Sequence, residues 1–225
     1  LADEVLLREP EEVQTFLLQT SILDRLCGPL CNAITGRHNG QEMLERLDAD
    51  NLFIMPLDGE KQWYRYHGLF SDLLRKRAKH RLGNTQDESG EVRLALLHLR
   101  ASEWYEQNGF VDEAIEHALR ADHFERVVHL LEEHIDAFWG RGEHTGLQNW
   151  LVKLPSELLF SNPHLSVFHA WFLFSGGQLE AAERSLQAVE HLLDSWPDRA
   201  TETESHTQDA MTCSDKVKLR GRVAT

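Results

Sequence analysis

Trp63-Tyr64-Arg65-Tyr66-His67-Gly68-Leu69-Phe70 is the stretch that decides the fold, because it joins a predicted β-hairpin to a predicted helix. Upstream, the apolar run at residues 51–57 is followed by Asp58-Gly59, a dipeptide typical of hairpin turns. Downstream, apolar residues recur at helical spacing over residues 70–78. His67 therefore stands where a helix begins, and the free N–H groups and positive dipole end there favour an anion such as phosphate. A packed aromatic corner explains the same stretch, and the local sequence slightly favours packing.

The composition predicts a soluble globular protein of one or two domains. The 225 residues are 41% hydrophobic and 27% charged. No run is long and apolar enough for a membrane span, no signal-peptide pattern opens the chain, and three cysteines give no disulfide framework. These features predict a cytoplasmic protein with no membrane partner. The first residue, Leu1, indicates a piece of a longer chain.

The charge is acidic overall but unevenly spread. The formal net charge of −14 argues against non-specific binding to nucleic acids. Basic residues nevertheless gather in the hairpin and the helix after it, namely Arg65, Arg75, Lys76, Arg77, Lys79 and Arg81. They form either a solvated helix face or a docking face for an acidic partner domain or a nucleotide. A further reading makes residues 1–82 a DNA-binding winged helix in their own right.

Residues 1–82 are predicted to form a winged-helix-like domain. The expected elements are two hairpin strands and four helices, over residues 11–23, 26–34, 41–47 and 69–82. The polar residues 83–91 are expected as a linker, and residues 92–225 as an incomplete helical domain. Within it, residues 197–215 are predicted to form a mobile loop, because they are rich in Thr, Glu and Asp.

Internal repetition defines the class of the helical domain. The segment from Gly109 to Ala114 resembles the segment from Gly177 to Ala182, 68 residues further on, which is two periods of about 34 residues. A degenerate intermediate copy is expected near Gly142. Glycine turns the chain between two helices, and alanine lets them approach closely. The predicted fold is therefore mostly α, a winged-helix-like domain followed by a tetratricopeptide-like solenoid whose curved surface suits a ligand or a protein.

The search for catalytic chemistry predicts no enzyme. Thirteen histidines show no metal-ligand spacing, and no phosphate loop or nucleophile elbow is present in the sequence. No catalytic residue and no metal site are therefore predicted. The aromatic residues of the helical half are explained mainly by packing, with the alternative that a few line a groove suited to sugars or hydrophobic effectors.

The order of several motifs resembles the MalT-like, ATP-dependent LuxR-type transcriptional regulators. The winged-helix part of the resemblance rests on the segments Phe16–Leu26, Leu30–Arg37, Asn51–Phe53 and Trp63–Phe70. The helical part rests on Ala118–Ala121 and Trp150–Pro155, and the whole resemblance covers about residues 1–195.

Members of that family carry an NTPase domain with a phosphate loop, a winged helix, a helical sensor and a C-terminal helix-turn-helix. This chain resembles only the middle two, so the resemblance implies no cofactor in the fragment, and ATP or ADP, with slow hydrolysis at most, in the full-length protein. In related signal-transduction NTPases a winged-helix histidine contacts the β-phosphate of ADP. The resemblance assigns that role to His67, with Arg65 a weaker candidate.

The resemblance also implies the partners of the fragment. These are a small-molecule or protein effector at the helical repeats, at residues that stay unknown, and the NTPase domain of the same chain. Activated protein is expected to self-associate and to bind DNA only through the C-terminal helix-turn-helix. The alternative is a tetratricopeptide-type interaction scaffold with no nucleotide switch.

Overall fold

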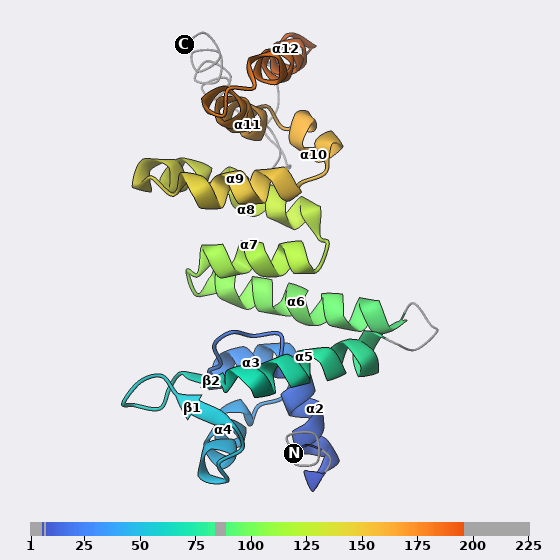
Figure 1. Ribbon diagram of the computed structural model, residues 1–225, viewed down its shortest axis with the longest axis vertical. Helices are drawn as coiled ribbons and strands as arrows, with labels where there is room; N and C mark the ends of the chain where they lie inside the picture. The colour runs from blue at the N-terminus through green and yellow to red at the C-terminus, as the bar shows by residue number, and fades with distance from the viewer. Residues whose placement is uncertain (1–5, 7, 84–88, 196–225) are drawn as a thin grey trace, which may run out of the picture. The chain divides into compact units, whose positions relative to one another are not determined.

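The computed structural model describes residue 6, residues 8–83 and residues 89–195 (Figure 1). The predicted fold class is confirmed, since helices dominate and a two-stranded sheet lies in the N-terminal part. The winged-helix part comprises α2 (Glu11–Thr20), α3 (Gly28–Thr35), α4 (Gly40–Ala49), β1 (Ile54–Pro56), β2 (Tyr64–Tyr66) and α5 (Gly68–Gly83). The helical part comprises α6 (Ser89–Gln107), α7 (Val111–Arg120), α8 (Phe124–Arg141), α9 (His144–Lys153), α10 (Ser156–Ser161), α11 (Pro163–Ser175) and α12 (Leu179–Ser195). The mobile loop predicted at residues 197–215 lies outside the described residues.

Local sequence explains how α2 and α3 begin and end. Pro10 precedes α2, and Glu11 and Glu12 in its first turn complement the helix dipole. Helix α3 ends at Gly36, which has a φ of 70° and donates its N–H to the carbonyl of Asn32. That left-handed conformation favours glycine, because other residues would place a Cβ too close to the backbone.

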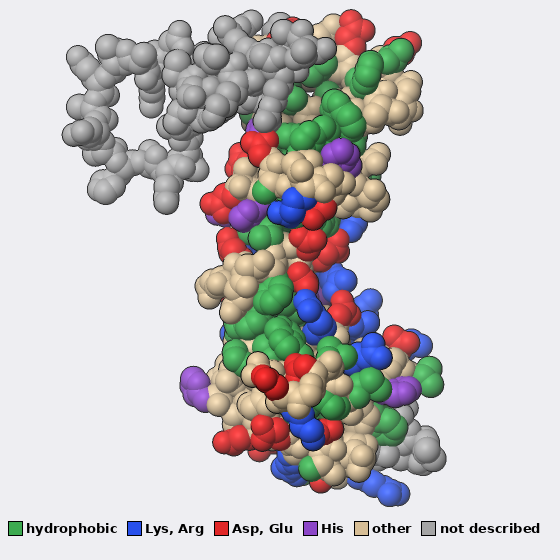
Figure 2. Space-filling view, turned by 90° about the vertical axis from the view of Figure 1, so that its left-hand side faces the viewer, with side chains coloured by type: hydrophobic (Ala, Val, Ile, Leu, Met, Phe, Trp, Pro, Cys, Tyr) green, Lys and Arg blue, Asp and Glu red, His purple; other side chains and the backbone are tan. Residues whose placement is uncertain are grey.

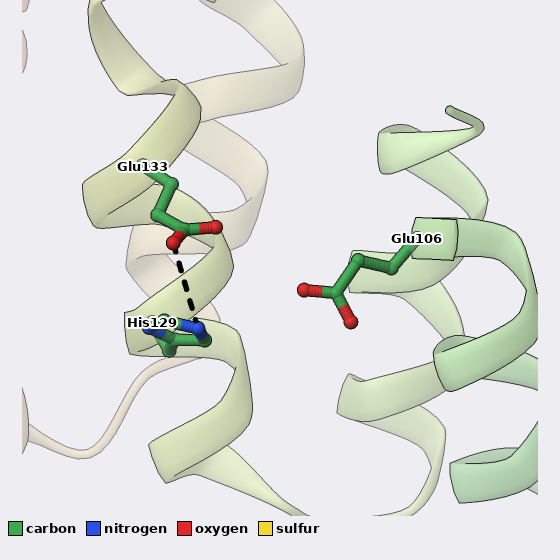
Figure 3. Close-up of side chains that lie close together, drawn as sticks. All are labelled: Glu106, His129 and Glu133. Carbon is green, nitrogen blue, oxygen red and sulfur yellow. Dashed lines mark ion pairs between the residues drawn. The ribbon is translucent and has the colours of Figure 1, made fainter. Parts of the chain in front are cut away.

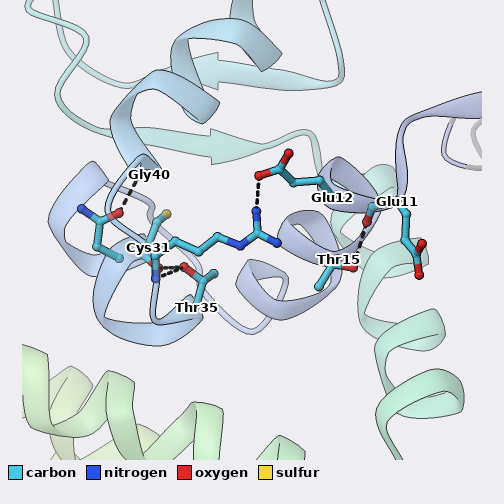
Figure 4. Close-up of polar contacts among 8 residues, drawn as sticks. Glu11, Glu12, Thr15, Cys31, Thr35 and Gly40 are labelled. Carbon is cyan, nitrogen blue, oxygen red and sulfur yellow. Dashed lines mark hydrogen bonds and ion pairs between the residues drawn. The ribbon is translucent and has the colours of Figure 1, made fainter.

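Helices α3 and α4 approach each other closely at Gly40. The N–H of Gly40 donates to Oδ1 of Asn32 at 2.7 Å (Figure 4). A Cβ added at Gly40 would lie 2.6 Å from the carbonyl oxygen of Gly28, which leaves no room for a side chain. The two helices therefore form a tightly packed helix-turn-helix, and α4 also packs against β1.

Strands β1 and β2 pair antiparallel, with Ile54 opposite Tyr66 and Pro56 opposite Tyr64. The hairpin is confirmed, but its loop spans residues 57–63 and is longer than the two-residue turn that Asp58-Gly59 is typical of. The reason is that the Asp58 carboxylate accepts hydrogen bonds from the N–H groups of Gln62 and Trp63, which closes a wider loop. Leu26 adds a bridge to the free edge of β2 at Tyr64.

Within the described part of the helical region, three of the turns between helices are made at a glycine in the left-handed conformation. Gly109, Gly142 and Gly177 have φ values of 79°, 77° and 77°, and they separate α6 from α7, α8 from α9 and α11 from α12. The degenerate copy predicted near Gly142 is therefore confirmed as a helix–turn–helix. No helix within the described part of the chain combines the length and the apolar character that crossing a bilayer requires.

The chain divides into two compact units, residues 1–123 and residues 124–225. In the first, α6 packs on α3 and α5, and the Arg100 guanidinium donates to the carbonyl of Ile34 at 3.0 Å. The linker predicted at residues 83–91 overlaps the last residue of α5 and the first three residues of α6, and these two helices pack together. As a division between domains it stays a prediction.

Removal of α6 and α7 is expected to destabilise the winged helix. A fragment that ends at residue 123 should melt at least about 5 °C above one that ends at residue 86, because the shorter fragment exposes Trp63 and the faces of α3 and α5 that pack on α6. Thermal circular dichroism of both fragments at equal concentration measures the difference. Equal midpoints would show that α6 and α7 contribute nothing to the stability of this unit.

Candidate functional site

His67 lies between the end of β2 and the first residue of α5. Its backbone N–H donates to the carbonyl of Phe53 at 2.7 Å, and its own carbonyl accepts from the N–H groups of Phe70 and Ser71 in the first turn of the helix. The side chain is exposed. The position predicted from the sequence, at the opening of a helix, is confirmed, and the imidazole points away from the core.

Arg65 is exposed on the same side of the chain as His67. The burial of β2 alternates, with Tyr64 and Tyr66 inside and Arg65 outside, so residues 65 and 67 share one face of the extended segment. The Nε of Arg65 donates to the sulfur of Met55, its cross-strand partner in β1, at 3.3 Å. The structure therefore brings the two predicted site residues to one surface.

The aromatic neighbours of His67 belong to the core, as the packing interpretation predicts. Tyr64 and Tyr66 are buried, and the Tyr66 hydroxyl shares a 2.7 Å hydrogen bond with the hydroxyl of Thr20. Burial raises the pKa of Tyr66 above its ordinary value, so its hydroxyl keeps its proton. Phe70 is also buried and packs edge-to-face on Tyr66. Packing and an exposed histidine thus coexist within the same eight residues.

Phe53 contacts His67 and its neighbours, although the sequence alone predicts no role for it in the site. Its ring stacks on Phe70 at 4.9 Å, and its carbonyl accepts the His67 N–H. Its φ of 54° is unusual for a bulky residue. Such strained residues persist only where the surrounding structure holds them, and here the hydrogen bond to His67 and the stack on Phe70 do so.

Some basic side chains of α5 make contacts inside the first unit. Arg75 donates to the carbonyl of Ser21 at 3.0 Å and forms an ion pair with Asp24 at 2.5 Å. Arg81 donates to the side-chain oxygen of Gln14 at 3.3 Å. On the face drawn in Figure 2, basic and acidic side chains of this unit are interspersed. The basic side chains therefore do not form a uniform cationic surface.

Helix α4 carries charges that oppose contact with DNA. It is the third helix of the winged-helix part, the position that reads the major groove in DNA-binding members of this architecture. Its exposed side chains include Glu42 and Glu45, and Asp50 directly after the helix is also exposed, with its carboxylate 3.7 Å from Arg46. Carboxylates on this face repel phosphates, so the charges weigh against residues 1–82 as a DNA-binding module.

The second unit carries a partly exposed aromatic group. Trp139 of α8 stacks on His144 of α9 at 4.4 Å, and Trp171 of α11 stands at 88° to Trp139 at 4.5 Å. Trp171 keeps 42% of its surface exposed, whereas Phe138 and Phe168 are buried. Packing thus accounts for part of the aromatic content of this unit, and Trp171 leaves an indole open to a ligand.

His129 and Glu133 lie one turn apart on α8 and form an ion pair of 3.7 Å (Figure 3). Figure 3 also labels Glu106, which belongs to α6 in the first unit. An exposed histidine–carboxylate pair on one helix face is ordinary surface chemistry. The absence of a metal site stays a prediction from the sequence.

Comparisons with known proteins agree with this architecture. Residues 2–86 match the family described as the MalT winged helix domain. The chain is 34% identical to the serine/threonine-protein kinase PknK of Mycobacterium tuberculosis, over 76% of the chain and 15% of that protein. It is 34% identical to the HTH-type transcriptional regulator MalT of Klebsiella pneumoniae, over 78% of the chain and 18% of that regulator. The MalT protein of Yersinia enterocolitica is 33% identical over 83% of the chain and 21% of its own length.

The chain spans about a fifth or less of the length of each of these relatives. The winged-helix match covers the segment that contains β1, β2, His67 and α5. The matches to the relatives extend over most of the chain, as the resemblance in the sequence implies. Residues 2–86 therefore belong to the MalT winged helix domain family, and the chain is similar to MalT-like regulators over most of its length.

Proposed function

We propose that the chain is the regulatory middle of a MalT-like transcriptional regulator, in which the winged helix holds a nucleotide in the resting state and the following helices bind an effector. The relatives support a regulatory role, because one is named a kinase and the others are named HTH-type regulators. A region common to proteins with such different outputs is more consistent with a shared control element than with either output. The chain itself is therefore proposed to be neither the kinase nor the DNA-binding part.

The observation that carries the proposal is the exposed His67 at the N-terminus of α5, with Arg65 on the same surface. An imidazole N–H and the helix N-terminus both favour a phosphate, and the guanidinium of Arg65 adds a second donor. The nucleotide, ADP or ATP, would be held mainly by the NTPase domain of the full-length protein, and His67 would contact its phosphate from the winged helix. Effector binding would release this contact, permit self-association and allow the C-terminal helix-turn-helix to act on DNA.

The proposal predicts that His67→Ala in the full-length regulator raises transcriptional activation in the absence of effector. Loss of one hydrogen bond to a charged phosphate should weaken ADP binding by about ten- to a hundredfold, since such bonds contribute about 1.5–3 kcal/mol. Arg65→Ala should act in the same direction with a smaller change. Reporter expression without effector and calorimetric titration with ADP are the two measurements.

His80→Ala is the matched control, because His80 is also exposed on α5 but lies near its other end. It should leave both readouts unchanged. A His67→Ala protein that stays silent without effector and keeps its ADP affinity would contradict the nucleotide contact. A full-length protein that binds no nucleotide at all would instead favour the scaffold alternative.

A further inference from the structure

One guanidinium joins the hairpin of the winged helix to the first helical pair. Arg25 lies between α2 and α3, and its guanidinium carbon lies 5.2 Å from the ring centre of Trp63 and 5.5 Å from that of Phe110. Its terminal nitrogen forms an ion pair of 2.5 Å with the Glu113 carboxylate. We call these four residues, Arg25, Trp63, Phe110 and Glu113, the Arg25 clamp.

On one side, the Arg25 clamp is tied to α7. Phe110 directly precedes α7, and Glu113 lies in its first turn. Trp63 packs edge-to-face on Phe110, with ring centres 6.0 Å apart, and on Trp104 of α6. A cation placed against two aromatic rings and a carboxylate is held by cation–π attraction and by charge. The start of α7 is thereby fastened to the hairpin.

On the other side, the Arg25 clamp leads to His67 through consecutive backbone contacts. Leu26, the residue after Arg25, exchanges two hydrogen bonds of 2.8 Å with Tyr64 in β2. Tyr64 itself follows Trp63, and β2 ends one residue before His67. The extended segment therefore runs from the clamp to the candidate phosphate contact in four residues.

The Arg25 clamp is partly open to solvent. The side chains of Arg25 and Glu113 are 42% and 36% exposed, so solvent and salt screen the ion pair. Trp63 and Phe110 are half-buried and shield one side of the guanidinium. A small displacement of the first turn of α7 would therefore separate the ion pair between Arg25 and Glu113 without unfolding the buried core.

We infer that Arg25 is a positioning residue for His67. Arg25 fixes the start of α7 against β2, and so couples the first helical pair, α6 and α7, to the phosphate contact. The inference rests on the proposed function of His67, and it adds the route by which that contact is regulated. While the clamp is closed, the bridge between Leu26 and Tyr64 holds β2 in register and His67 at the opening of α5. When Glu113 withdraws, β2 loosens and His67 leaves its position.

Amide hydrogen exchange of the chain tests the positioning step without any nucleotide. Arg25→Glu and Glu113→Arg should each speed exchange of the Leu26, Tyr64 and His67 N–H groups by about tenfold, because a local opening no longer has to break the clamp. The double variant Arg25→Glu with Glu113→Arg restores opposite charges and should recover most of the protection.

The matched control is the ion pair between Arg37 and Glu12, which is also 2.5 Å long and partly exposed (Figure 4, where Glu12 is labelled). Arg37→Glu and Glu12→Arg should leave exchange at Leu26, Tyr64 and His67 unchanged. If the Arg25→Glu protein exchanges these three amides no faster than the control variants, the positioning role of Arg25 is overturned. If the charge swap gives no recovery, the ion pair is not what holds the segment.

Function in the full-length regulator provides the second arm. Arg25→Glu should raise activation without effector and weaken ADP binding by several-fold, and the charge swap should reverse both changes. Arg25→Glu added to His67→Ala should produce no further increase in activation without effector. Suppose that Arg25→Glu speeds amide exchange but leaves ADP binding unchanged, whereas His67→Ala weakens ADP binding. That result would overturn the coupling between the Arg25 clamp and the phosphate contact, and the proposed function of His67 would stand. Unchanged ADP binding in His67→Ala would instead remove the proposed function, and the exchange data would still decide the positioning of β2.

Discussion

Acidification from about pH 6.5 to pH 4 is expected to destabilise the first unit steeply, because two buried histidines must take up protons. His98 of α6 and His117 of α7 are 7% and 3% exposed, and their Nδ1 atoms lie 2.9 Å apart. Burial is the main reason that the pKa of His98 falls to about 4 and that of His117 to about 3. The positive charges of Arg120 and Arg75 contribute to both of these lowered values. In the folded chain one neutral ring donates to the other.

The direction of the pH dependence follows from these depressed values. In the unfolded chain a histidine titrates near pH 6.5, so above that pH neither state binds the extra proton and the full stability is present. Below it, the unfolded state binds protons that the folded state refuses, and stability falls by about 1.4 kcal/mol per pH unit for each histidine. Urea unfolding at pH 7.5, 6.5, 5.5 and 5, followed by circular dichroism, should therefore show a loss of at least about 2 kcal/mol between pH 6.5 and 5.

The double variant His98→Asn with His117→Asn separates this cause from the titration of carboxylates. Asparagine keeps a donor and an acceptor near the position of Nδ1 but takes up no proton in this range. The variant should therefore lose most of the pH dependence between pH 6.5 and 5. His80→Asn, at an exposed position on α5, should keep it. An unchanged slope in the double variant would assign the acid lability to other groups.

The elements that the sequence predicts well are those that depend on neighbouring residues. The passage from hairpin to helix at His67 follows from alternation in β2, the apolar spacing of α5 and the turn residues between the strands. The same holds for the turns at Gly109, Gly142 and Gly177, where each glycine supplies a left-handed conformation. Local chemistry determines these features, so a single sequence is sufficient to find them.

The features that the sequence does not reveal are contacts between distant residues. The Arg25–Glu113 pair joins positions 88 residues apart, and nothing near either residue marks the other as its partner. His98 and His117 lie 19 residues apart, and their pairing depends on how α6 folds back on α7 rather than on any ligand spacing. The left-handed backbone of Phe53 likewise has no sequence signature, since it is imposed by the stack on Phe70 and the hydrogen bond from His67.

The candidate site shows the same division within eight residues. The position of His67 before a helix follows from local sequence, but the exposure of its side chain depends on which face of β2 the core covers. That choice is made by Tyr64 and Tyr66, whose rings are buried against helices from elsewhere in the unit. A role for His67 in phosphate contact could therefore be predicted by resemblance, whereas its accessibility needed the structure.

Replacing Gly40 by alanine, which adds one methyl group, is expected to cause the largest loss of stability among glycine-to-alanine changes in this chain. A Cβ there would lie 2.6 Å from the Gly28 carbonyl oxygen, 2.7 Å from Oδ1 of Asn32 and 3.1 Å from the Cβ of Cys31. The first of these atoms belongs to the backbone of α3 and the second accepts the N–H of Gly40, so neither yields without moving a helix or breaking a hydrogen bond. Gly40→Ala should therefore cost about 2–3 kcal/mol, which lowers the melting temperature of the chain by about 6–10 °C in thermal circular dichroism.

Two further variants isolate the close approach of α3 and α4 as the cause. Gly68 is also the first residue of a helix, but a Cβ there meets nothing within 4 Å, so Gly68→Ala should leave the melting temperature unchanged or slightly raised. Asn32→Ala combined with Gly40→Ala removes one of the two closest atoms and leaves the Gly28 carbonyl in place, so the pair should recover only part of the loss. Equal melting temperatures for Gly40→Ala and Gly68→Ala would mean that α4 moves away from α3 at no cost, and the helix-turn-helix core would then not depend on glycine at this crossing.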